Sequence, residues 1–287
     1  MTIHGIWAAV VTPLDRELAP DSSTAVPYYR ELLDRGCDGI NVLGTTGEAM
    51  SFGVEQRLKL MEAIASSGLP MERAMVGAGA AALDDAVTLT KAAFNFGFAA
   101  ALVMPPFFFR GVSDGGIADF FEALFERANP PRKRVLLYNF PRMSGVTFTP
   151  ALVDRLLARF PEAFAGMKDS SNNAALQSAI LAAHADFAVL PGSESDLLAA
   201  KRRGVAGCIS GSVALWPELA QAVFTGDDAE QERELTRRRS ALDGLPFIPA
   251  VRRCIARDRG DDAWERIVPP QRPLTADEAR LLEREAR

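Results

Sequence analysis

The residue with the strongest case for chemistry is Lys168, which ends the short apolar run that starts at Phe164. It is the one lysine of the chain at the carboxyl end of a strand-like run, where α/β folds place their catalytic groups. A neutral lysine amine attacks a carbonyl to form an imine, provided that burial or a cationic neighbour lowers its pKa from about 10.4. The position therefore indicates a Schiff-base nucleophile. It equally permits a lysine that extends from a strand end into solvent.

A second chemical group, Tyr138, ends another apolar run, which starts at Val135. Side chains alternate between the two faces of a strand, so Tyr138 shares a face with Leu136, and Lys168 shares one with Gly166. If these strands are neighbours in a barrel, both side chains point inward at the same end. A phenol beside an amine is then a proton-transfer pair. An isolated tyrosine at this position would instead be a core aromatic residue with a satisfied hydroxyl.

The segment Gly44-Thr45-Thr46-Gly47 follows the second apolar run. Its two hydroxyls, together with backbone N–H groups in a chain flexible enough to turn sharply at Gly47, suit a small carboxylate. The same pattern also describes an ordinary glycine-rich turn. We expect the next residue, Glu48, to favour the start of the following helix through the helix dipole, and we assign it no catalytic role.

Eight short apolar runs provide the elements that must position these side chains. Each run is bounded by Gly, Pro or polar residues, as buried parallel strands are, and segments with helical spacing separate the runs. Eight strands that alternate with helices predict a (β/α)8 TIM barrel over residues 1–225. The runs begin near Ile6, Ile40, Met75, Ala101, Val135, Ala165, Ala188 and Cys208.

The end of the chain, residues 226–287, predicts a C-terminal helical extension packed on the barrel. Residues 227–244 form a charged helical pattern, and residues 246–259 form a more apolar one. A capping box at Thr275 opens a last helix that should end at Arg287. We expect the extension to cover a barrel face or to build a subunit contact.

An open, doubly wound sheet is the alternative fold. Gly77-Ala-Gly79-Ala-Ala-Ala82 follows an apolar run and opens a helix, as a dinucleotide-binding fingerprint would. However, no acidic residue occurs between Asp85 and Asp114, so the acid that would bind the ribose is missing. The glycines are better explained by a tight turn with close packing.

Composition excludes several classes of function. The chain has 287 residues, 48% of them hydrophobic and 24% charged, and a formal net charge of −5, which fits a globular protein and disfavours nucleic-acid binding. No apolar run approaches the ~18 residues of a membrane span, and the N-terminus predicts no secretory signal. Three scattered cysteines predict a reducing compartment, most simply the cytoplasm. With two isolated histidines, a metal site or a histidine-based triad is not expected.

Three motifs resemble the dihydrodipicolinate synthase/N-acetylneuraminate lyase family: Gly44-Thr-Thr-Gly-Glu48, Tyr138-Asn-Phe-Pro141 and Lys168-Asp-Ser170. The resemblance covers the whole chain and implies a (β/α)8 barrel, often a homotetramer, that needs no metal or other cofactor. It implies that Lys168 forms an imine with pyruvate or another 2-keto acid, and that Tyr138 and Thr45 relay protons. The implied substrate-binding residues are Thr46, Gly47, Arg142, Gly192 and Ile209.

Two departures from the family pattern concern the second substrate. The synthases carry an arginine two residues after the motif proline, where this chain has Met143, while Arg142 lies one residue earlier. The position of their second relay tyrosine corresponds to Phe108, which has no hydroxyl. Both changes count against dihydrodipicolinate synthesis and leave the imine machinery intact. The Phe107–Phe109 cluster could instead pack at a subunit contact.

The sequence thus predicts a Schiff-base lyase or aldolase that acts on pyruvate or a related 2-keto acid, such as a 2-keto-3-deoxy sugar acid. Dihydrodipicolinate synthase and a dehydratase or deaminase of the same family are the enzymatic alternatives. A keto-acid-binding sensor is the non-enzymatic alternative, and a nicotinamide-dependent oxidoreductase depends on the glycine motif alone. We also expect the chain to form a homodimer or homotetramer. It should bind a small-molecule substrate and have no nucleic-acid or membrane partners. Substrate choice should depend on loop residues 107–112, 142–144 and 193–195.

Overall fold

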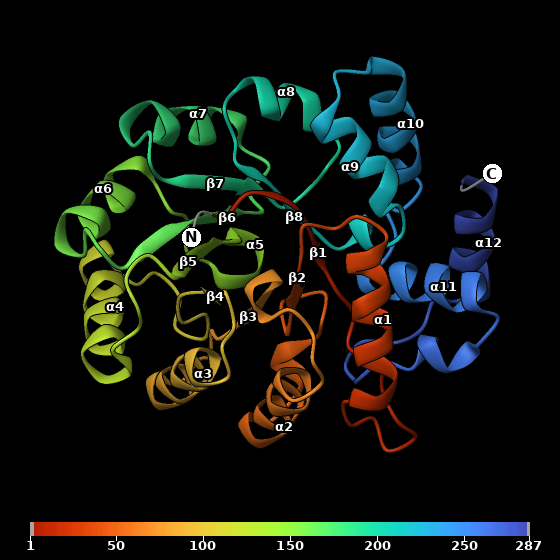
Figure 1. Cartoon of the computed structure of the whole chain (residues 1–287), viewed down its shortest axis with the longest axis horizontal. Coiled ribbons are helices and arrows are strands. Elements are labelled where there is room, and N and C mark those ends of the chain that lie inside the picture. Colours follow the sequence, from red (N-terminus) through yellow and green to blue (C-terminus); the bar gives the residue numbers. More distant parts are fainter. Residues whose placement is uncertain (1–2, 286–287) are drawn as a thin grey trace.

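A computed structural model describes residues 3–285 of the chain and has eight parallel strands surrounded by helices (Figure 1). The strands are hydrogen-bonded in the order β7-β6-β5-β4-β3-β2-β1-β8, so β1 pairs with both β2 and β8. The backbone N–H of Ala206, just before β8, donates to the carbonyl oxygen of Val189 in β7 at 2.9 Å. The strands are β1 (Gly5–Ala9), β2 (Gly39–Val42), β3 (Ala74–Gly77), β4 (Ala100–Val103), β5 (Val135–Asn139), β6 (Phe164–Asp169), β7 (Ala188–Pro191) and β8 (Gly207–Ser210).

This strand order confirms the predicted barrel. In a doubly wound sheet, the strand order changes direction at one point in the sheet. Here each strand lies beside the next strand along the chain. The glycines that suggested a nucleotide fingerprint have a packing explanation. A Cβ atom on Gly77 would lie 2.0 Å from the carbonyl oxygen of Leu43, and one on Gly79 would lie 2.8 Å from the backbone nitrogen of Met104.

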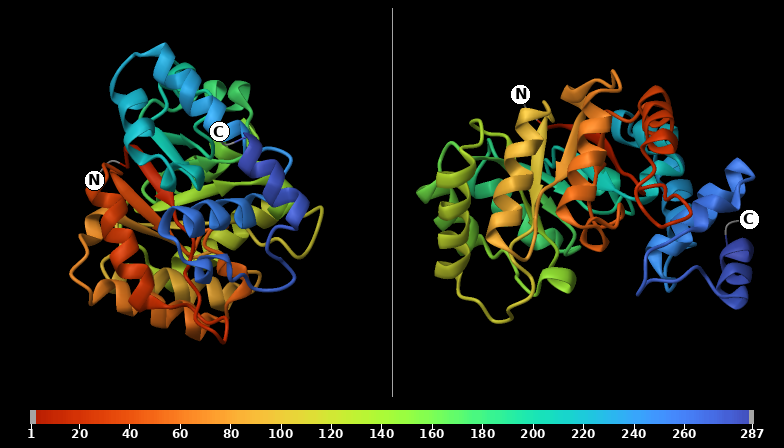
Figure 2. Two further views of the ribbon diagram at one scale, coloured as in Figure 1. Left: turned by 90° about the vertical axis from the view of Figure 1, so that its right-hand side faces the viewer. Right: turned by 90° about the horizontal axis from the view of Figure 1, so that it is seen from below.

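Helices between the strands form the outer ring of the barrel (Figures 1 and 2). One of them starts with a typical cap, because the Thr149 hydroxyl accepts a hydrogen bond from the N–H of Leu152 and Pro150 occupies the first helical position. These helices are α1 (Ser22–Asp34), α2 (Val54–Ala65), α3 (Leu83–Asn95), α4 (Asp114–Ala128), α5 (Pro141–Ser144), α6 (Pro150–Arg159), α7 (Ala174–Ala183), α8 (Leu197–Arg202) and α9 (Pro217–Thr225), with short 3-10 turns η1 (Ala49–Ser51), η2 (Met71–Arg73) and η3 (Ser212–Ala214).

Two apolar clusters hold the barrel together. One fills its interior and includes Trp7, Leu102, Leu136, Leu190 and Ile209. The other lies between the strands and the helices. Because every strand is buried on both faces, its sequence is nearly uniformly apolar rather than alternating.

The C-terminal extension consists of α10 (Ala229–Ser240), α11 (Phe247–Arg259), η4 (Asp262–Glu265) and α12 (Ala276–Glu285), which lie together on one side of the barrel (Figure 2). The predicted capping box is present, since the Thr275 hydroxyl accepts the N–H of Glu278 at 3.3 Å and the Glu278 carboxylate accepts the N–H of Thr275 at 2.7 Å. The expected end of the last helix, Arg287, lies outside the described residues.

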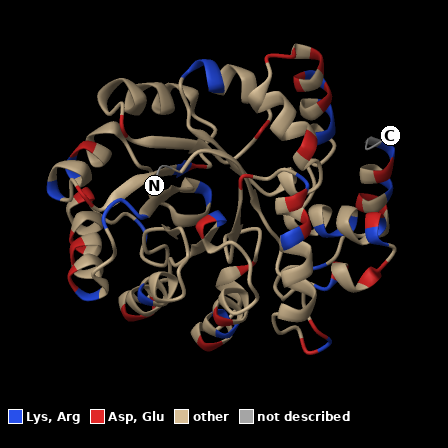
Figure 3. Ribbon diagram, viewed as in Figure 1, with Lys and Arg blue, Asp and Glu red and all other residues tan. Residues whose placement is uncertain are grey.

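Charged side chains lie mainly on the outer helices and on the extension, while the strands carry few (Figure 3). Within residues 3–285, no helix combines the length and the apolar character that crossing a membrane would require.

Candidate active site

Strands β5 and β6 bring Lys168 and Tyr138 side by side. The two residues are direct partners in the parallel register, and each side chain is about 4% exposed. The Lys168 amine lies 4.6 Å from the centre of the Tyr138 ring. Both groups therefore sit in the barrel mouth, as their spacing along the strands predicted, and not in open solvent.

The loop after β2 adds the threonines. The Thr45 and Tyr138 hydroxyls are 3.1 Å apart and share a hydrogen bond in which either can donate. Thr46 is buried, and its hydroxyl lies so close to Gly211 that a Cβ there would come within 2.8 Å. The lysine amine, the phenol and the Thr45 hydroxyl thus lie together in one site, with the phenol hydrogen-bonded to Thr45.

Most of the residues named from sequence line one cavity of about 690 Å³, a volume suited to a small ligand. They are Thr45, Thr46, Tyr138, Arg142, Lys168 and Gly192. Two others do not line it. The carbonyl oxygen of Gly47 accepts a hydrogen bond from the Thr12 hydroxyl at 2.8 Å, and Ile209 is fully buried in the interior cluster.

A second cavity of about 430 Å³ adjoins the first and is mostly apolar. The two share Thr45, Tyr138 and Met143 among their lining residues. The rest of the second lining includes Met50, Met104 and Phe107, so Thr45 and Tyr138 lie between the first cavity and a more apolar one.

A buried network fixes the ends of β5 and β6. The Asp169 carboxylate accepts hydrogen bonds from Asn139 Nδ2 at 2.7 Å, from Gln177 Nε2 at 2.9 Å and from the N–H of Ser171 at 3.1 Å. Asp169 is therefore occupied on the outer face of the strand. Among the described residues, Lys168 has no ion-pair partner, so its amine is free of a competing carboxylate.

Another buried ion pair anchors the threonine loop to the extension. Arg252 of α11 donates through Nε to Glu48 Oε2 at 2.8 Å and through Nη2 to the carbonyl oxygen of Thr12 at 2.7 Å. The other Glu48 oxygen accepts the N–H of Val268 at 3.2 Å. Glu48 also adopts the left-handed conformation, with φ of 54°, which costs a non-glycine residue energy.

The expectation that Glu48 only favours the start of a helix through the helix dipole is therefore incomplete. Its carboxylate pairs with the fully buried Arg252. No local pattern could have revealed this pair, which joins positions 204 residues apart. Arginine accounts for most of the cations of this chain, so Arg252 did not stand out in the sequence.

Glu194, which follows β7, lies in the loop 193–195 that was expected to affect substrate choice, but its burial was not predicted. Its side chain is fully buried, and neither carboxylate oxygen has a hydrogen-bond partner among the described residues. Burial first, and the nearby Glu194 carboxylate second, raise the pKa of Cys208 well above that of an ordinary thiol. A buried, unpaired acid within electrostatic range of the site is unusual.

The two departures from the family pattern have distinct positions. Arg142 lines the larger cavity, is exposed, stacks 5.9 Å from the Phe140 ring centre and has no carboxylate partner within residues 3–285. Met143 lines both cavities. Phe108 is 75% exposed and stacks edge-on against Phe109, outside both linings.

Over the described part of the chain, no group of three or more His, Cys, Asp or Glu side chains could hold a metal ion.

Comparison with known proteins identifies the relatives of this barrel. The model of the family described as "Dihydrodipicolinate synthetase family" matches residues 2–242. The chain belongs to this family. It is 34% identical to an "Uncharacterized DapA-like lyase" of Chloroflexus aurantiacus, over 87% of this chain and 85% of that protein. It is 31% identical to a 4-hydroxy-tetrahydrodipicolinate synthase of Synechococcus sp. (strain CC9605), over 78% and 74% of the two chains.

Solved structures of the dihydrodipicolinate synthetase family agree with the fold. The dihydrodipicolinate synthase from Agrobacterium tumefaciens str. C58 superposes with a TM-score of 0.92 at 30% identity, covering 99% of this chain and 98% of that one. The Sulfolobus solfataricus 2-keto-3-deoxygluconate aldolase variant gives a TM-score of 0.85 at 20% identity, over 98% and 94% of the two chains, and shows the fold alone. The chain is accordingly a lyase of the class I aldolase type, which confirms the predicted enzyme class.

Proposed function

We propose that this enzyme cleaves a 2-keto-3-deoxy sugar acid to pyruvate and an aldehyde through a Schiff base on Lys168. The observation that carries the proposal is the buried Lys168 amine beside Tyr138, whose hydroxyl is bonded to Thr45. Polar groups that suit a hydroxylated substrate line the same cavity: Ser170, Ser171, Asn172 and Ser193.

The proposed chemistry gives Lys168 the covalent step and Tyr138 the proton transfers. The Lys168 amine attacks the keto carbon, Tyr138 protonates the departing hydroxyl so that water leaves, and the protonated imine becomes an electron sink. The Tyr138 phenolate accepts the proton of the C4 hydroxyl, the C3–C4 bond breaks, and its electron pair enters the imine to give an enamine and the free aldehyde. Tyr138, in contact with Thr45, then gives this proton to the enamine carbon. Water adds to the imine and returns a proton to the Tyr138 phenolate, and the adduct collapses to pyruvate and Lys168.

The remaining residues hold the substrate in this proposal. The Thr46 hydroxyl binds the substrate carboxylate near Gly192, and Gly47 shapes the loop rather than touching the ligand. The Arg142 guanidinium, free of a carboxylate partner within residues 3–285, is available at the cavity edge for the far end of the substrate.

Borohydride trapping with pyruvate tests the covalent step. We expect a reduced pyruvyl adduct on Lys168, located by peptide mass spectrometry and absent from Lys168→Ala. Lys201→Ala is a matched control that should leave the adduct unchanged, because Lys201 donates to the carbonyl oxygen of Gly226 far along the chain from the site. If neither pyruvate nor 2-oxo sugar acids give an adduct, the lysine is not a nucleophile and the keto-acid sensor becomes the better interpretation.

Dihydrodipicolinate synthesis is the second candidate, because Arg142 lines the cavity despite its shifted position. It predicts measurable condensation of pyruvate with aspartate semialdehyde, abolished by Arg142→Gln. A dehydratase or deaminase would share the trapped adduct but release water or ammonia from the keto acid instead of an aldehyde. Assays of the three products therefore separate these reactions.

We also propose that the chain forms a homodimer or homotetramer in the cytoplasm. Exposed apolar side chains near the two cavities support a subunit contact: Met50, Phe108, Phe109, Val112 and Met143. The three free cysteines are buried, in keeping with a reducing compartment. Light scattering should report a multiple of the 31.0 kDa chain mass, lowered by the double substitution of Phe108 and Phe109 with serine.

A further inference from the structure

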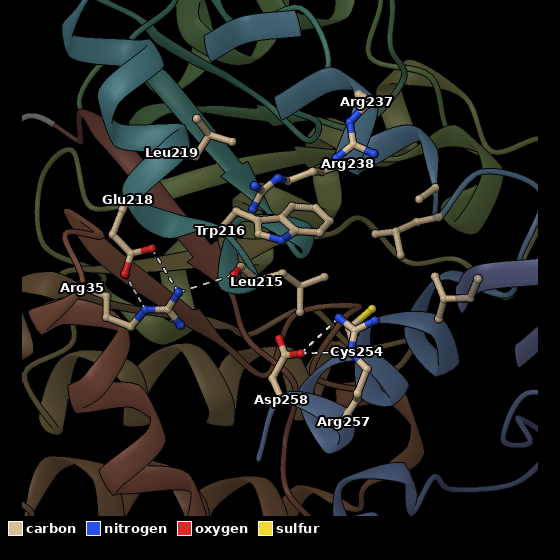
Figure 4. Close-up of a pocket in the computed structure, with 13 residues that line it drawn as sticks. Arg35, Leu215, Trp216, Glu218, Leu219, Arg237, Arg238, Cys254, Arg257 and Asp258 are labelled. Carbon is tan, nitrogen blue, oxygen red and sulfur yellow. Dashed lines mark hydrogen bonds and ion pairs between the residues drawn. The ribbon is translucent and has the colours of Figure 1, made fainter. Parts of the chain in front are cut away.

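A cavity of about 580 Å³ lies between the barrel helices and the C-terminal extension (Figure 4), and Lys168 does not line it. We call it the extension cavity. Its walls come from the end of α1, from the segment before and within α9, and from α10, α11 and α12. Its lining residues are Arg35, Leu215, Trp216, Glu218, Leu219, Arg237, Arg238, Ala241, Leu242, Cys254, Arg257, Asp258 and Leu282.

The lining combines an apolar floor with charged side chains. Leu215, Leu242 and Leu282 are buried, and the Trp216 ring is partly exposed in the middle of the cavity (Figure 4). Four arginines and two carboxylates line the cavity, and Glu234, outside the lining, pairs with Arg237 and Arg238. An apolar surface next to guanidinium groups suits a molecule that has both an apolar body and an anionic group.

Two of the arginines keep donors free for a ligand. The hydrogen bonds of Arg238 within the described residues use Nε alone, which donates to Glu234 at 2.6 Å, so its terminal nitrogens remain available. Arg257 bonds the neighbouring Asp258 through Nε at 3.1 Å and through Nη2 at 3.0 Å, which leaves Nη1. Arg238 and Arg257 lie on opposite sides of Trp216 (Figure 4).

Arg35 has no such capacity. It donates through Nε at 2.6 Å and through Nη2 at 3.0 Å to Glu218, and Nη1 lies 3.7 Å from Glu31. Arg35 therefore closes the wall, and the ligand-binding capacity belongs to Arg238 and Arg257.

The extension cavity shares a wall with the catalytic one. Leu242 lines both cavities, and it belongs to the corner that joins α10 to α11. Residues 242–249 of this corner form one side of the cavity that contains Lys168. A molecule held between α10 and α11 would therefore fix the corner that shapes the mouth of the active site.

We propose that the extension cavity is a regulatory site for a small organic anion with an apolar body, which binds against Trp216 with its anionic group on the free donors of Arg238 or Arg257. The binding stands on the cavity itself, whereas its effect on catalysis rests on the proposed function at Lys168. If the two sites are coupled, the anion changes the affinity for the keto acid by some factor. The keto acid must then change the affinity for the anion by the same factor.

Phenyl phosphate is a suitable probe, because it combines an aromatic body with a dianion. Titration should change the tryptophan fluorescence saturably in the wild-type protein and in Lys168→Ala, and the change should vanish in Trp216→Phe. The other tryptophans, Trp7 and Trp264, are buried and should not respond. Inorganic phosphate and phenol, which each lack one half of the probe, should bind at least tenfold more weakly.

At least one of the variants Arg238→Gln and Arg257→Gln should weaken phenyl phosphate binding about tenfold. Arg233→Gln is the matched control, since Arg233 lies on α10 outside this lining and should bind like the wild type. Calorimetry that finds no saturable binding, or finds wild-type affinity in both Arg238→Gln and Arg257→Gln, would overturn the site. This experiment needs no catalysis, so it can succeed where borohydride trapping fails. If trapping succeeds and phenyl phosphate binds without changing the affinity for pyruvate, the regulatory role is wrong.

Discussion

Removing Arg252 should destabilise the enzyme more than removing the arginine next to it. The side chains of Glu48 and Arg252 are both buried, so in Arg252→Met the Glu48 carboxylate loses its ion-pair partner in the interior. Leaving one charge of a buried pair uncompensated costs about 3–5 kcal/mol, a large share of a total stability of about 5–15 kcal/mol. The adjacent Arg253 makes partly exposed ion pairs with Glu265 and Glu283, so Arg253→Met should cost about 1 kcal/mol or less.

Urea unfolding followed by far-UV circular dichroism measures both variants, and a double-mutant cycle isolates the pair. Glu48→Gln combined with Arg252→Met removes the unpaired charge, so it should recover at least half of the loss of Arg252→Met. Because Glu48 ends the loop that carries Thr45, Arg252→Met should also lower kcat under conditions where it is fully folded. A loss below about 1 kcal/mol for Arg252→Met, or a double variant that loses the sum of the two single losses, would refute this reasoning.

Three further predictions concern the site and the thiols. Tyr138→Phe should lower kcat about 100-fold or more without changing the far-UV spectrum, as expected for loss of a general acid–base, and an unchanged kcat would remove Tyr138 from the mechanism. Thr45→Val, which deletes one neutral hydrogen bond, should lower kcat about tenfold; an effect as large as that of Tyr138→Phe would mean that Thr45 does more than orient the phenol. Burial raises the pKa of Cys37 from 9.0 to about 12, so the unfolded thiol ionises first and stability should fall as the pH rises from 9 to 12. Urea midpoints should show a shallower fall in Cys37→Ala, and an identical slope would contradict the assignment.

The sequence predicted the barrel because the physical signals of a parallel barrel are local. Short runs such as Val135–Asn139 are apolar on both faces, and their repetition with helical segments leaves few topologies. The position of Lys168 beside Tyr138 followed from strand alternation and neighbouring strands, so the core of the site was also predictable. The roles of these side chains remain predictions until the trapping experiment is done.

The parts that the sequence did not predict depend on contacts between distant segments. The partnership of Glu48 with Arg252 joins the start of the barrel to the extension, and no spacing rule connects two such positions. The burial of Glu194 without a partner likewise depends on how the segments around β7 and β8 pack. Local patterns assign elements and faces, whereas buried pairs between elements require the three-dimensional arrangement.

The division between the barrel and the extension bears on how this enzyme chooses a substrate. The family match ends at residue 242, and Lys168, Tyr138 and Thr45 all lie within it. The side of the catalytic cavity formed by residues 243–249 lies beyond that limit, as does Arg252, which anchors the threonine loop. In the proposed function, imine chemistry thus uses residues of the barrel, whereas the extension contributes to the shape of the cavity mouth. Substitutions at Phe247 or Ile248 should therefore alter KM for the keto acid more than the yield of the trapped pyruvyl adduct, and the reverse should hold for Tyr138.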